Sequence, residues 1–146
     1  MARRFTLAEA QSLIPRVESL LREAVSLKSD YQEADQVIQA MAQRVSMMGG
    51  MIVDRDQALD ARNRRNEVAA KLGAVIEQVQ EFGCVIKDLD TGLIDFPTLL
   101  RGVEVYLCWK LGEPAIGFWH GTDEGFRGRK VIDRDFLDHH RGDRNH

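Results

Sequence analysis

Residues 16–48, RVESLLREAVSLKSDYQEADQVIQAMAQRVSMM, decide the fold of this chain because one apolar pattern runs through all of them. Apolar residues recur at alternating intervals of three and four positions over more than four heptads, which is the pattern of a coiled-coil seam. At 1.5 Å per residue, a helix over this stretch would be about 50 Å long. The seam consists of Val17, Leu20, Ala24, Leu27, Tyr31, Ala34, Ile38, Met41, Val45 and Met48, and Leu13 extends it backwards.

Both ends of this helix carry sequence signals. Thr6 and Glu9 have the spacing of a capping box, so a helix begins near residue 6. Pro15 either interrupts that helix or restarts it, because proline suits the first turn of a helix better than its interior. The pair Gly49-Gly50 predicts the end of the long helix, since glycine readily adopts the left-handed conformation of a C-cap.

A second helix follows, with Asp54 or Asp56 as its cap and Gly83 at its end. Its apolar positions again alternate by three and four, and Arg65 is the one polar member of the series. Two such helices with a short connection predict an antiparallel helical hairpin over residues 6–82. The series is Ala58, Ala61, Arg65, Val68, Leu72, Val75, Val79 and Phe82.

The apolar stripes of this hairpin are wider than two helices can cover. Either the C-terminal half of the chain or a second copy of the hairpin must bury the remainder. We favour a homodimer through the hairpin, because the C-terminal half looks too small to cover about 50 Å of helix.

Beyond Gly83 the apolar period changes from helical to strand-like. Residues 84–97, CVIKDLDTGLIDFP, read as two strands joined by a turn at Asp90-Thr91-Gly92, which places Lys87 opposite Asp95 as an ion pair. A second hairpin is expected from residues 103–109 and 115–120. The prediction is therefore a single α+β domain over residues 1–146. A helical hairpin is followed by a small antiparallel sheet of about four strands in residues 84–132, and residues 133–146 are expected to fray.

Composition and charge exclude several classes of protein. Hydrophobic residues make up 44% and charged residues 29% of the chain, with a net charge of -3. Residues 1–83 carry 11 basic and 12 acidic side chains and residues 84–146 carry 9 and 11, so neither half attracts nucleic acid. The basic cluster Arg62, Arg64 and Arg65 is interpreted as a solvated helix face.

Membrane insertion and disulfide formation are not expected either. No apolar run approaches the roughly 20 residues that cross a bilayer, and the N-terminus lacks the apolar segment of a signal peptide. The two cysteines, Cys84 and Cys108, are too few for a disulfide framework, and we expect a cytoplasmic protein with free thiols.

Residues 104–120, EVYLCWKLGEPAIGFWH, hold the densest group of chemically useful side chains. Motifs for nucleotide binding, zinc proteases and serine hydrolases are absent, so no motif indicates a cofactor or substrate. A catalytic Cys108 is not favoured, because burial raises the pKa of a thiol.

Two functions fit these residues. A metal-dependent, hydrolase-like enzyme would use Asp88, Glu113 and His120, since carboxylates and one imidazole suit manganese or iron. We favour a non-enzymatic binding or assembly protein, because aromatic side chains with a few polar groups are typical of ligand sites and interfaces. Its ligand, a small molecule or a protein, would contact a polar-aromatic site on the sheet that consists of Asp88, Trp109, Glu113, Trp119, His120 and Arg129.

Four segments resemble one known family. These segments are FTLAEAQSLIP (5–15), GCVIKDLDTGLIDFP (83–97), VYLCWKLGEPAIGFWH (105–120) and GFRGR (125–129). They are similar to the pattern of a bacterial family of small uncharacterised proteins, domain of unknown function 2203, over residues 5–132. The resemblance implies no activity, and it marks Lys87, Asp88, Gly92, Asp95, Phe96, Cys108, Trp109, Gly112, Glu113, Trp119, His120, Gly125, Phe126 and Arg129 as positions of the family pattern.

Overall fold

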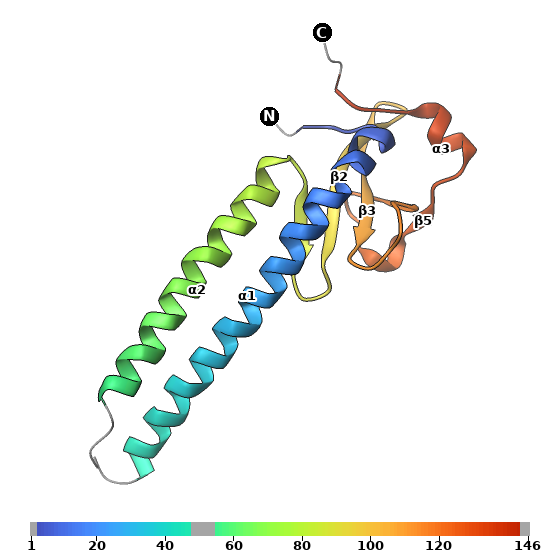
Figure 1. Ribbon diagram of the computed structural model, residues 1–146. Coiled ribbons are helices and arrows are strands. Elements are labelled where there is room, and N and C mark those ends of the chain that lie inside the picture. The colour runs from blue at the N-terminus through green and yellow to red at the C-terminus, as the bar shows by residue number, and fades with distance from the viewer. Residues whose placement is uncertain (1–2, 48–54, 144–146) are drawn as a thin grey trace.

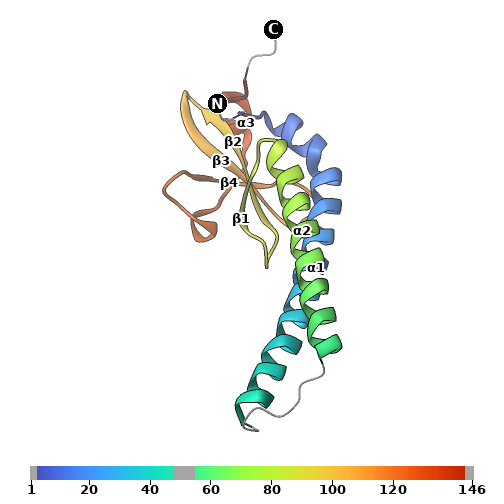
Figure 2. The same ribbon diagram turned by 90° about the vertical axis from the view of Figure 1, so that its left-hand side faces the viewer.

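Two long helices lie side by side, and a small antiparallel sheet packs against one end of the pair (Figures 1 and 2). The computed structural model describes residues 3–47 and 55–143. Helix α1 spans Leu7–Met47 and helix α2 spans Arg55–Glu81. This arrangement confirms the predicted α+β class, with a helical hairpin followed by the sheet.

The start of α1 is held by the predicted capping box. The Glu9 N–H donates to Thr6 Oγ1 at 3.1 Å, and the Thr6 N–H donates to Glu9 Oε1 at 2.9 Å. Pro15 neither interrupts nor restarts the helix, which runs through it without a break. The buried neighbours Ile14 and Val17 anchor the helix to the core on both sides of Pro15, and this packing outweighs one lost backbone hydrogen bond.

The far ends of the two helices are only partly described. The predicted breaker Gly49-Gly50, the last seam residue Met48 and the predicted cap Asp54 lie outside the described residues. The other end of α2 is as predicted, because α2 stops at Glu81 and Gly83 adopts a φ of +98°.

The two helices pack along the predicted apolar positions. Buried side chains recur on both helices, and the polar position Arg65 is explained by an ion pair, since its Nη1 lies 2.9 Å from Asp35 Oδ1. The buried members on the two helices include Val17, Ala24, Ala34 and Met41 of α1 and Ala61, Val68, Val75 and Val79 of α2.

The sheet is larger than predicted because two short strands join it. Its order is β1-β2-β3-β4-β5, and β6 pairs with β2; every pairing is antiparallel. A short 3-10 helix (Phe126–Gly128) precedes β5, and helix α3 (Arg134–His139) precedes β6. The strands are β1 (Val85–Asp88), β2 (Leu93–Leu100), β3 (Val103–Lys110), β4 (Phe118–Gly121), β5 (Lys130–Val131) and β6 (His140–Arg141).

The first hairpin has the predicted turn but a different register. Gly92 closes the turn with a φ of +70° and donates its N–H to Leu89 O at 3.2 Å. An irregularity between Ile86 and Asp88 shifts the pairing, so that Val85 lies opposite Asp95. The predicted Lys87–Asp95 pair is therefore wrong, and Lys87 Nζ lies 5.0 Å from the Tyr106 ring instead.

Strand β2 continues three residues beyond Pro97 and turns directly into β3 at Arg101-Gly102. Pro97 is tolerated in a central strand because of where its backbone points. On that side of β2, the pairing with β1 ends at Asp95 and the pairing with β6 begins at Leu99. Neither strand therefore needs a hydrogen bond from the backbone nitrogen of Pro97. The Pro97 carbonyl accepts the Phe5 N–H at 2.7 Å, which ties the N-terminus to the sheet.

The segment that the sequence predicted to fray includes helix α3 and strand β6. Asp133 caps α3 by accepting the Phe136 N–H at 2.9 Å, and the Phe136 ring is buried. His140 Nε2 accepts the Leu7 N–H at 3.0 Å. The buried Phe136 ring and the hydrogen bond to the start of α1 therefore anchor this segment to the rest of the protein, although its composition is polar.

The core lies between the helices and one face of the sheet. Strand residues alternate between faces, so Leu107 and Trp109 of β3 point inward, while Tyr106 and Cys108 lie on the outer face. Trp109 is the largest fully buried side chain of the described residues. No helix within residues 3–47 and 55–143 is both long and apolar enough to cross a membrane.

Candidate functional site

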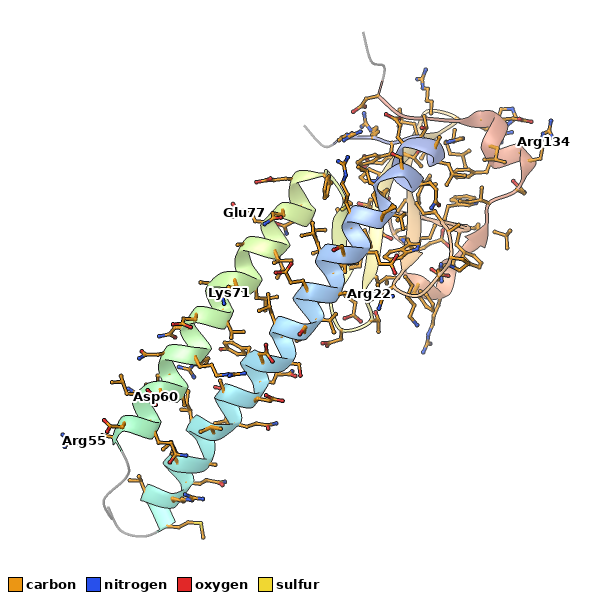
Figure 3. All side chains as sticks on the ribbon, in the orientation of Figure 1. Arg22, Arg55, Asp60, Lys71, Glu77 and Arg134 are labelled. Carbon is orange, nitrogen blue, oxygen red and sulfur yellow. The ribbon has the colours of Figure 1, made fainter. Side chains whose placement is uncertain are left out.

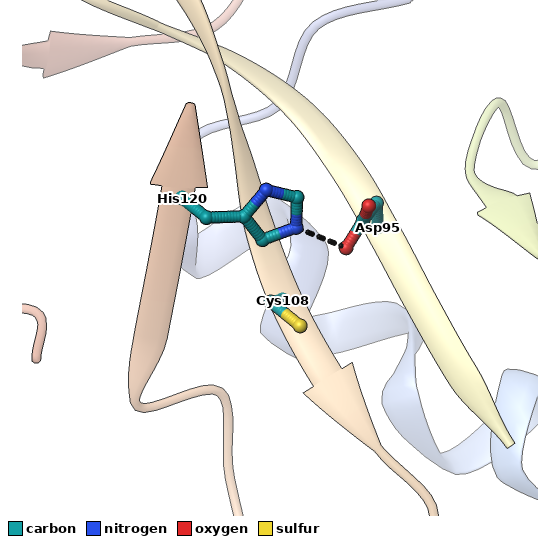
Figure 4. A group of neighbouring side chains, drawn as sticks. All are labelled: Asp95, Cys108 and His120. Atoms are coloured by element: carbon teal, nitrogen blue, oxygen red, sulfur yellow. Dashed lines mark hydrogen bonds and ion pairs between the residues drawn. The ribbon is translucent and has the colours of Figure 1, made fainter. Parts of the chain in front are cut away.

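Three neighbouring strands bring Asp95, Cys108 and His120 together on the outer face of the sheet (Figure 4). Asp95 of β2 lies opposite Cys108 of β3, and His120 of β4 lies opposite Tyr106, two residues along from Cys108. The exposed fractions are 0% for Asp95, 0% for Cys108 and 2% for His120. Three ionisable groups are therefore buried on the face of the sheet that the helices do not cover.

Aromatic rings and long cations pack over the same face. The Tyr106 ring lies 5.5 Å from the His120 ring, and Lys87 Nζ lies 5.0 Å from the centre of the Tyr106 ring. The Arg129 guanidinium lies 4.0 Å from the centre of the Phe118 ring. The chain between β4 and β5 loops out on this side of the sheet (Figure 2), so the outer face has a small core of its own.

His120 uses both ring nitrogens within this cluster. Its Nε2 lies 3.0 Å from Asp95 Oδ1, and its Nδ1 lies 2.8 Å from the Gly121 carbonyl oxygen. The other carboxylate oxygen, Asp95 Oδ2, is buried, and no donor among the described residues meets it in hydrogen-bonding geometry. A buried hydrogen-bond acceptor without a partner lowers the stability of the folded state, so most such atoms in native proteins are paired. Asp95 Oδ2 is therefore the unusual atom of the cluster.

The Cys108 thiol is not an activated nucleophile. Burial, and then the negative charge of Asp95, raise the pKa of Cys108 from about 9 to about 12. His120 has no ring nitrogen free to act as a base toward Cys108, since both are already engaged. The arrangement therefore does not form a Cys–His catalytic pair.

In the folded chain both cysteines should react slowly with thiol reagents, measured with a chelator present so that no bound metal ion affects the thiols. Burial raises the pKa of Cys84 to about 11, and Cys108 is higher still. At pH 8 we expect iodoacetamide to modify the native thiols roughly 100-fold or more slowly than the urea-unfolded chain, because the thiolate is the reactive form. Mass spectrometry of the modified sites measures this, and rapid native modification of Cys108 would contradict it.

Three of the residues predicted for the site form one connected group. Arg129 Nη2 contacts both carboxylate oxygens of Glu113, at 2.7 and 2.8 Å. Trp109 donates its indole N–H to the Glu113 carbonyl oxygen at 3.1 Å. Glu113 also accepts the Lys110 N–H at 2.7 Å, so its carboxylate and carbonyl close the turn after β3.

The other predicted residues lie elsewhere. Asp88 is exposed, and its Oδ1 accepts the Asp90 N–H at 3.0 Å. Trp119 is half-buried beside Phe136, with Lys130 Nζ 4.7 Å from its ring. Within the connected group, Trp109 is fully buried in the helix-facing core. The predicted residues are thus spread over both faces of the sheet and one exposed strand end.

The predicted metal ligands are not gathered, whereas another set is. In the part of the chain that the structure describes, the group of His, Cys, Asp and Glu side chains close enough to share one metal ion is Asp95, Cys108 and His120, with donor atoms within 4.8 Å of one another. Only His120 belongs to both sets. Asp95 and Cys108 were missed, although an aspartate between Ile94 and Phe96 in an apolar run is a signal for a buried carboxylate.

Comparison with known proteins shows the family and nothing about activity. Residues 3–132 match the family described as "Uncharacterized conserved protein (DUF2203)". No curated protein and no solved structure matches the chain. The match covers most of the 146 residues, including both helices and β1 to β5. The chain therefore belongs to the DUF2203 family.

Proposed function

We propose that this protein is an assembly module in which two copies join through their helical hairpins. The contact region is the part of the hairpin farthest from the sheet, residues 30–47 of α1 and 55–66 of α2, which we call the arm. The observation that carries the proposal is the apolar surface that the arm leaves exposed.

The sheet covers only the other end of the hairpin (Figures 1 and 2). Leu21 is the last residue of α1 in the core cluster that includes the sheet. The Lys28 ammonium forms an ion pair with Asp90 in the turn between β1 and β2, which lies alongside the middle of α1. Figure 3 shows Arg55 and Asp60 on the arm, well away from the sheet.

Large apolar side chains are exposed along the arm. The exposed fractions are 57% for Leu59, 40% for Val37, 37% for Val45 and 84% for Met47. One flank of the helix pair also has an open hollow, rimmed by Arg55 and Arg62. Its apolar lining consists of Ile38, Met41, Ala42, Val45, Ala58 and Leu59. Apolar side chains gathered in this way, with a polar rim, are typical of an interface.

A second copy of the arm fits this surface better than an unrelated partner. The arm carries both the projecting side chain Leu59 and the apolar hollow beside it, so the same surface can supply both halves of a two-fold contact. A flank about 27 Å long and about 20 Å wide has an area of roughly 540 Å², about two-thirds of the ~800 Å² per partner of a standard-sized interface.

The test is the mass of the protein in solution. Sedimentation equilibrium should give about 33 kDa, twice the 16.6 kDa of one chain. The variant Leu59→Glu places a charge in the contact and should weaken dimerisation by at least about 100-fold, since desolvating an unpaired charge is costly.

A matched control tells a specific contact from general loss of hydrophobic surface. Leu137 of α3 is 44% exposed and lies at the opposite end of the molecule from the arm. The variant Leu137→Glu should remain a dimer, and circular dichroism should show that both variants are folded. A monomeric wild-type chain, or a Leu59→Glu variant that dimerises normally, would refute the proposal.

The polar-aromatic ligand site and the enzyme alternative have less support. Trp109 is buried in the core and Glu113 is occupied by Arg129, so neither is presented to an outside ligand. A metal-dependent enzyme would have to be built on Asp95, Cys108 and His120 rather than on the trio expected from the sequence.

A further inference from the structure

We propose that Asp95, Cys108 and His120 form a binding site for one divalent transition-metal ion of the zinc class. The site is independent of the arm and of dimerisation. It rests on four features: three neighbouring donor atoms, an unpartnered buried oxygen, the orientation of the imidazole and the balance of charge.

The donor set matches what zinc binds in proteins. One carboxylate, one thiolate and one imidazole supply oxygen, sulfur and nitrogen, and the thiolate selects zinc-class ions over calcium or magnesium. The ligands come from three adjacent strands, β2, β3 and β4, which hold their backbones at fixed spacing (Figure 4). Sites placed on strands are more rigid than sites placed on loops.

The distances are close to those of a tetrahedral site. Bonds of 2.0–2.3 Å to a tetrahedral ion put neighbouring donor atoms about 3.4 Å apart. Asp95 Oδ1 and His120 Nε2 are 3.0 Å apart, and all the donor atoms of the cluster lie within 4.8 Å of one another. Side-chain rotations that move the donor atoms by about 1 Å would therefore bring them to tetrahedral separations, without movement of the strands.

Asp95 Oδ2 is the independent sign that a ligand belongs here. Asp95 is fully buried, and within residues 3–47 and 55–143 this oxygen has no donor in hydrogen-bonding geometry. Buried carboxylate oxygens in proteins are normally paired or bound to a metal. A cation held between the carboxylate, the thiolate and the imidazole would give the carboxylate the partner that it lacks.

The imidazole is oriented as a metal ligand. A backbone carbonyl only accepts hydrogen bonds, so the 2.8 Å contact to Gly121 O requires that His120 Nδ1 carry a proton. The lone pair of the neutral ring is then on Nε2, which points at Asp95. Histidines that bind metals usually donate their other N–H to a carbonyl or carboxylate in this way.

Charge also favours a divalent ion. With Cys108 as a thiolate and Asp95 ionised, the ligands carry two negative charges, which a divalent cation neutralises inside the protein. Metal binding releases two protons to solvent. One comes from the Cys108 thiol, and the other is the proton shared by His120 Nε2 and Asp95 Oδ1. Three protein ligands leave one coordination position for a water molecule.

Cobalt titration of the untagged full chain tests the proposal, with Co²⁺ as a spectroscopic substitute for Zn²⁺. We expect one Co²⁺ per chain, with intense visible bands and a thiolate-to-cobalt charge-transfer band. The variant Cys84→Ser removes the other buried cysteine, which is not part of the cluster. Because the chain has two cysteines, a charge-transfer band retained in Cys84→Ser assigns the sulfur ligand to Cys108 even if Cys108 variants fail to fold.

The variants Cys108→Ser and His120→Ala should weaken Co²⁺ binding by more than the roughly 100-fold that loss of an outer-shell partner costs. The Cys108→Ser variant should also lose the charge-transfer band. No stoichiometric Co²⁺ in the wild-type chain, or no charge-transfer band in Cys84→Ser, would overturn the proposal. So would binding that is unchanged in folded Cys108→Ser, since the ion would then be bound by exposed groups such as His139.

Discussion

Replacing Trp109 with alanine should remove about 3–5 kcal/mol from the free energy of unfolding, as large aromatic-to-alanine changes do in cores. Trp109 is fully buried, and its indole N–H donates to the Glu113 carbonyl oxygen. The substitution leaves a cavity and an unpaired carbonyl in the turn after β3. Since a domain of this size is stable by about 5–15 kcal/mol, urea denaturation should show a large shift of the midpoint.

Trp119→Ala provides the matched comparison. Trp119 is half-buried and packs against Phe136, with Lys130 over its ring. Less apolar area is lost, so we expect about 1–2 kcal/mol. Equal costs at the two positions, or a larger cost at Trp119, would mean that Trp109 is not the centre of the core. In that case residues 104–120 would again have to be considered as a ligand surface.

The helical hairpin was predictable because its signals are local and repeated. The capping box depends on residues three apart, and the apolar spacing averages over many turns, so one exception such as Arg65 does not disturb it. Even that exception has its partner in Asp35 of the facing helix, at 2.9 Å. A repeated pattern still predicts a helix when one residue deviates from it. Pro15 therefore led to a wrong prediction of a break in the helix, but not of the helix itself.

The sheet was harder to predict because its register depends on single residues. In the first hairpin Asp88 pairs with Leu93, and the irregularity between Ile86 and Asp88 then places Ile86 opposite Ile94, so none of the predicted pairs is retained. The β2–β3 hairpin turns at Arg101 and Gly102, with φ values of +52° and +81°. A two-residue turn with both φ values positive normally uses Asn-Gly or Asp-Gly. Because arginine occupies the first position here, the sequence did not predict this turn.

The candidate metal site was missed for the same reason. Asp95 and Cys108 become neighbours only when β2 runs on to Leu100 and returns through that two-residue turn. His120 was singled out as the only histidine before residue 139, which composition alone can show. The sequence therefore predicted that His120 belongs to a candidate site, but not that Asp95 and Cys108 lie beside it.

Gly92→Ala should cost about 2–5 kcal/mol of stability, measured by urea denaturation, because two penalties act together. Gly92 has a φ of +70°, a conformation that costs an L-residue about 1–2 kcal/mol. A Cβ at this position would lie 2.4 Å from Leu111 Cβ, and such overpacking costs about 1–3 kcal/mol. Leu111 cannot withdraw freely, since its N–H donates to the Gly92 carbonyl oxygen at 3.0 Å.

Two other glycines separate the penalties. Gly112 has a φ of +102° but no heavy atom within 4 Å of an added Cβ, so Gly112→Ala should cost only the conformational part, about 1–2 kcal/mol. Gly73 lies inside α2 with open space around it, and Gly73→Ala should stabilise the protein by about 0.5–1 kcal/mol. If Gly92→Ala costs no more than Gly112→Ala, the first turn of the sheet does not press against Leu111.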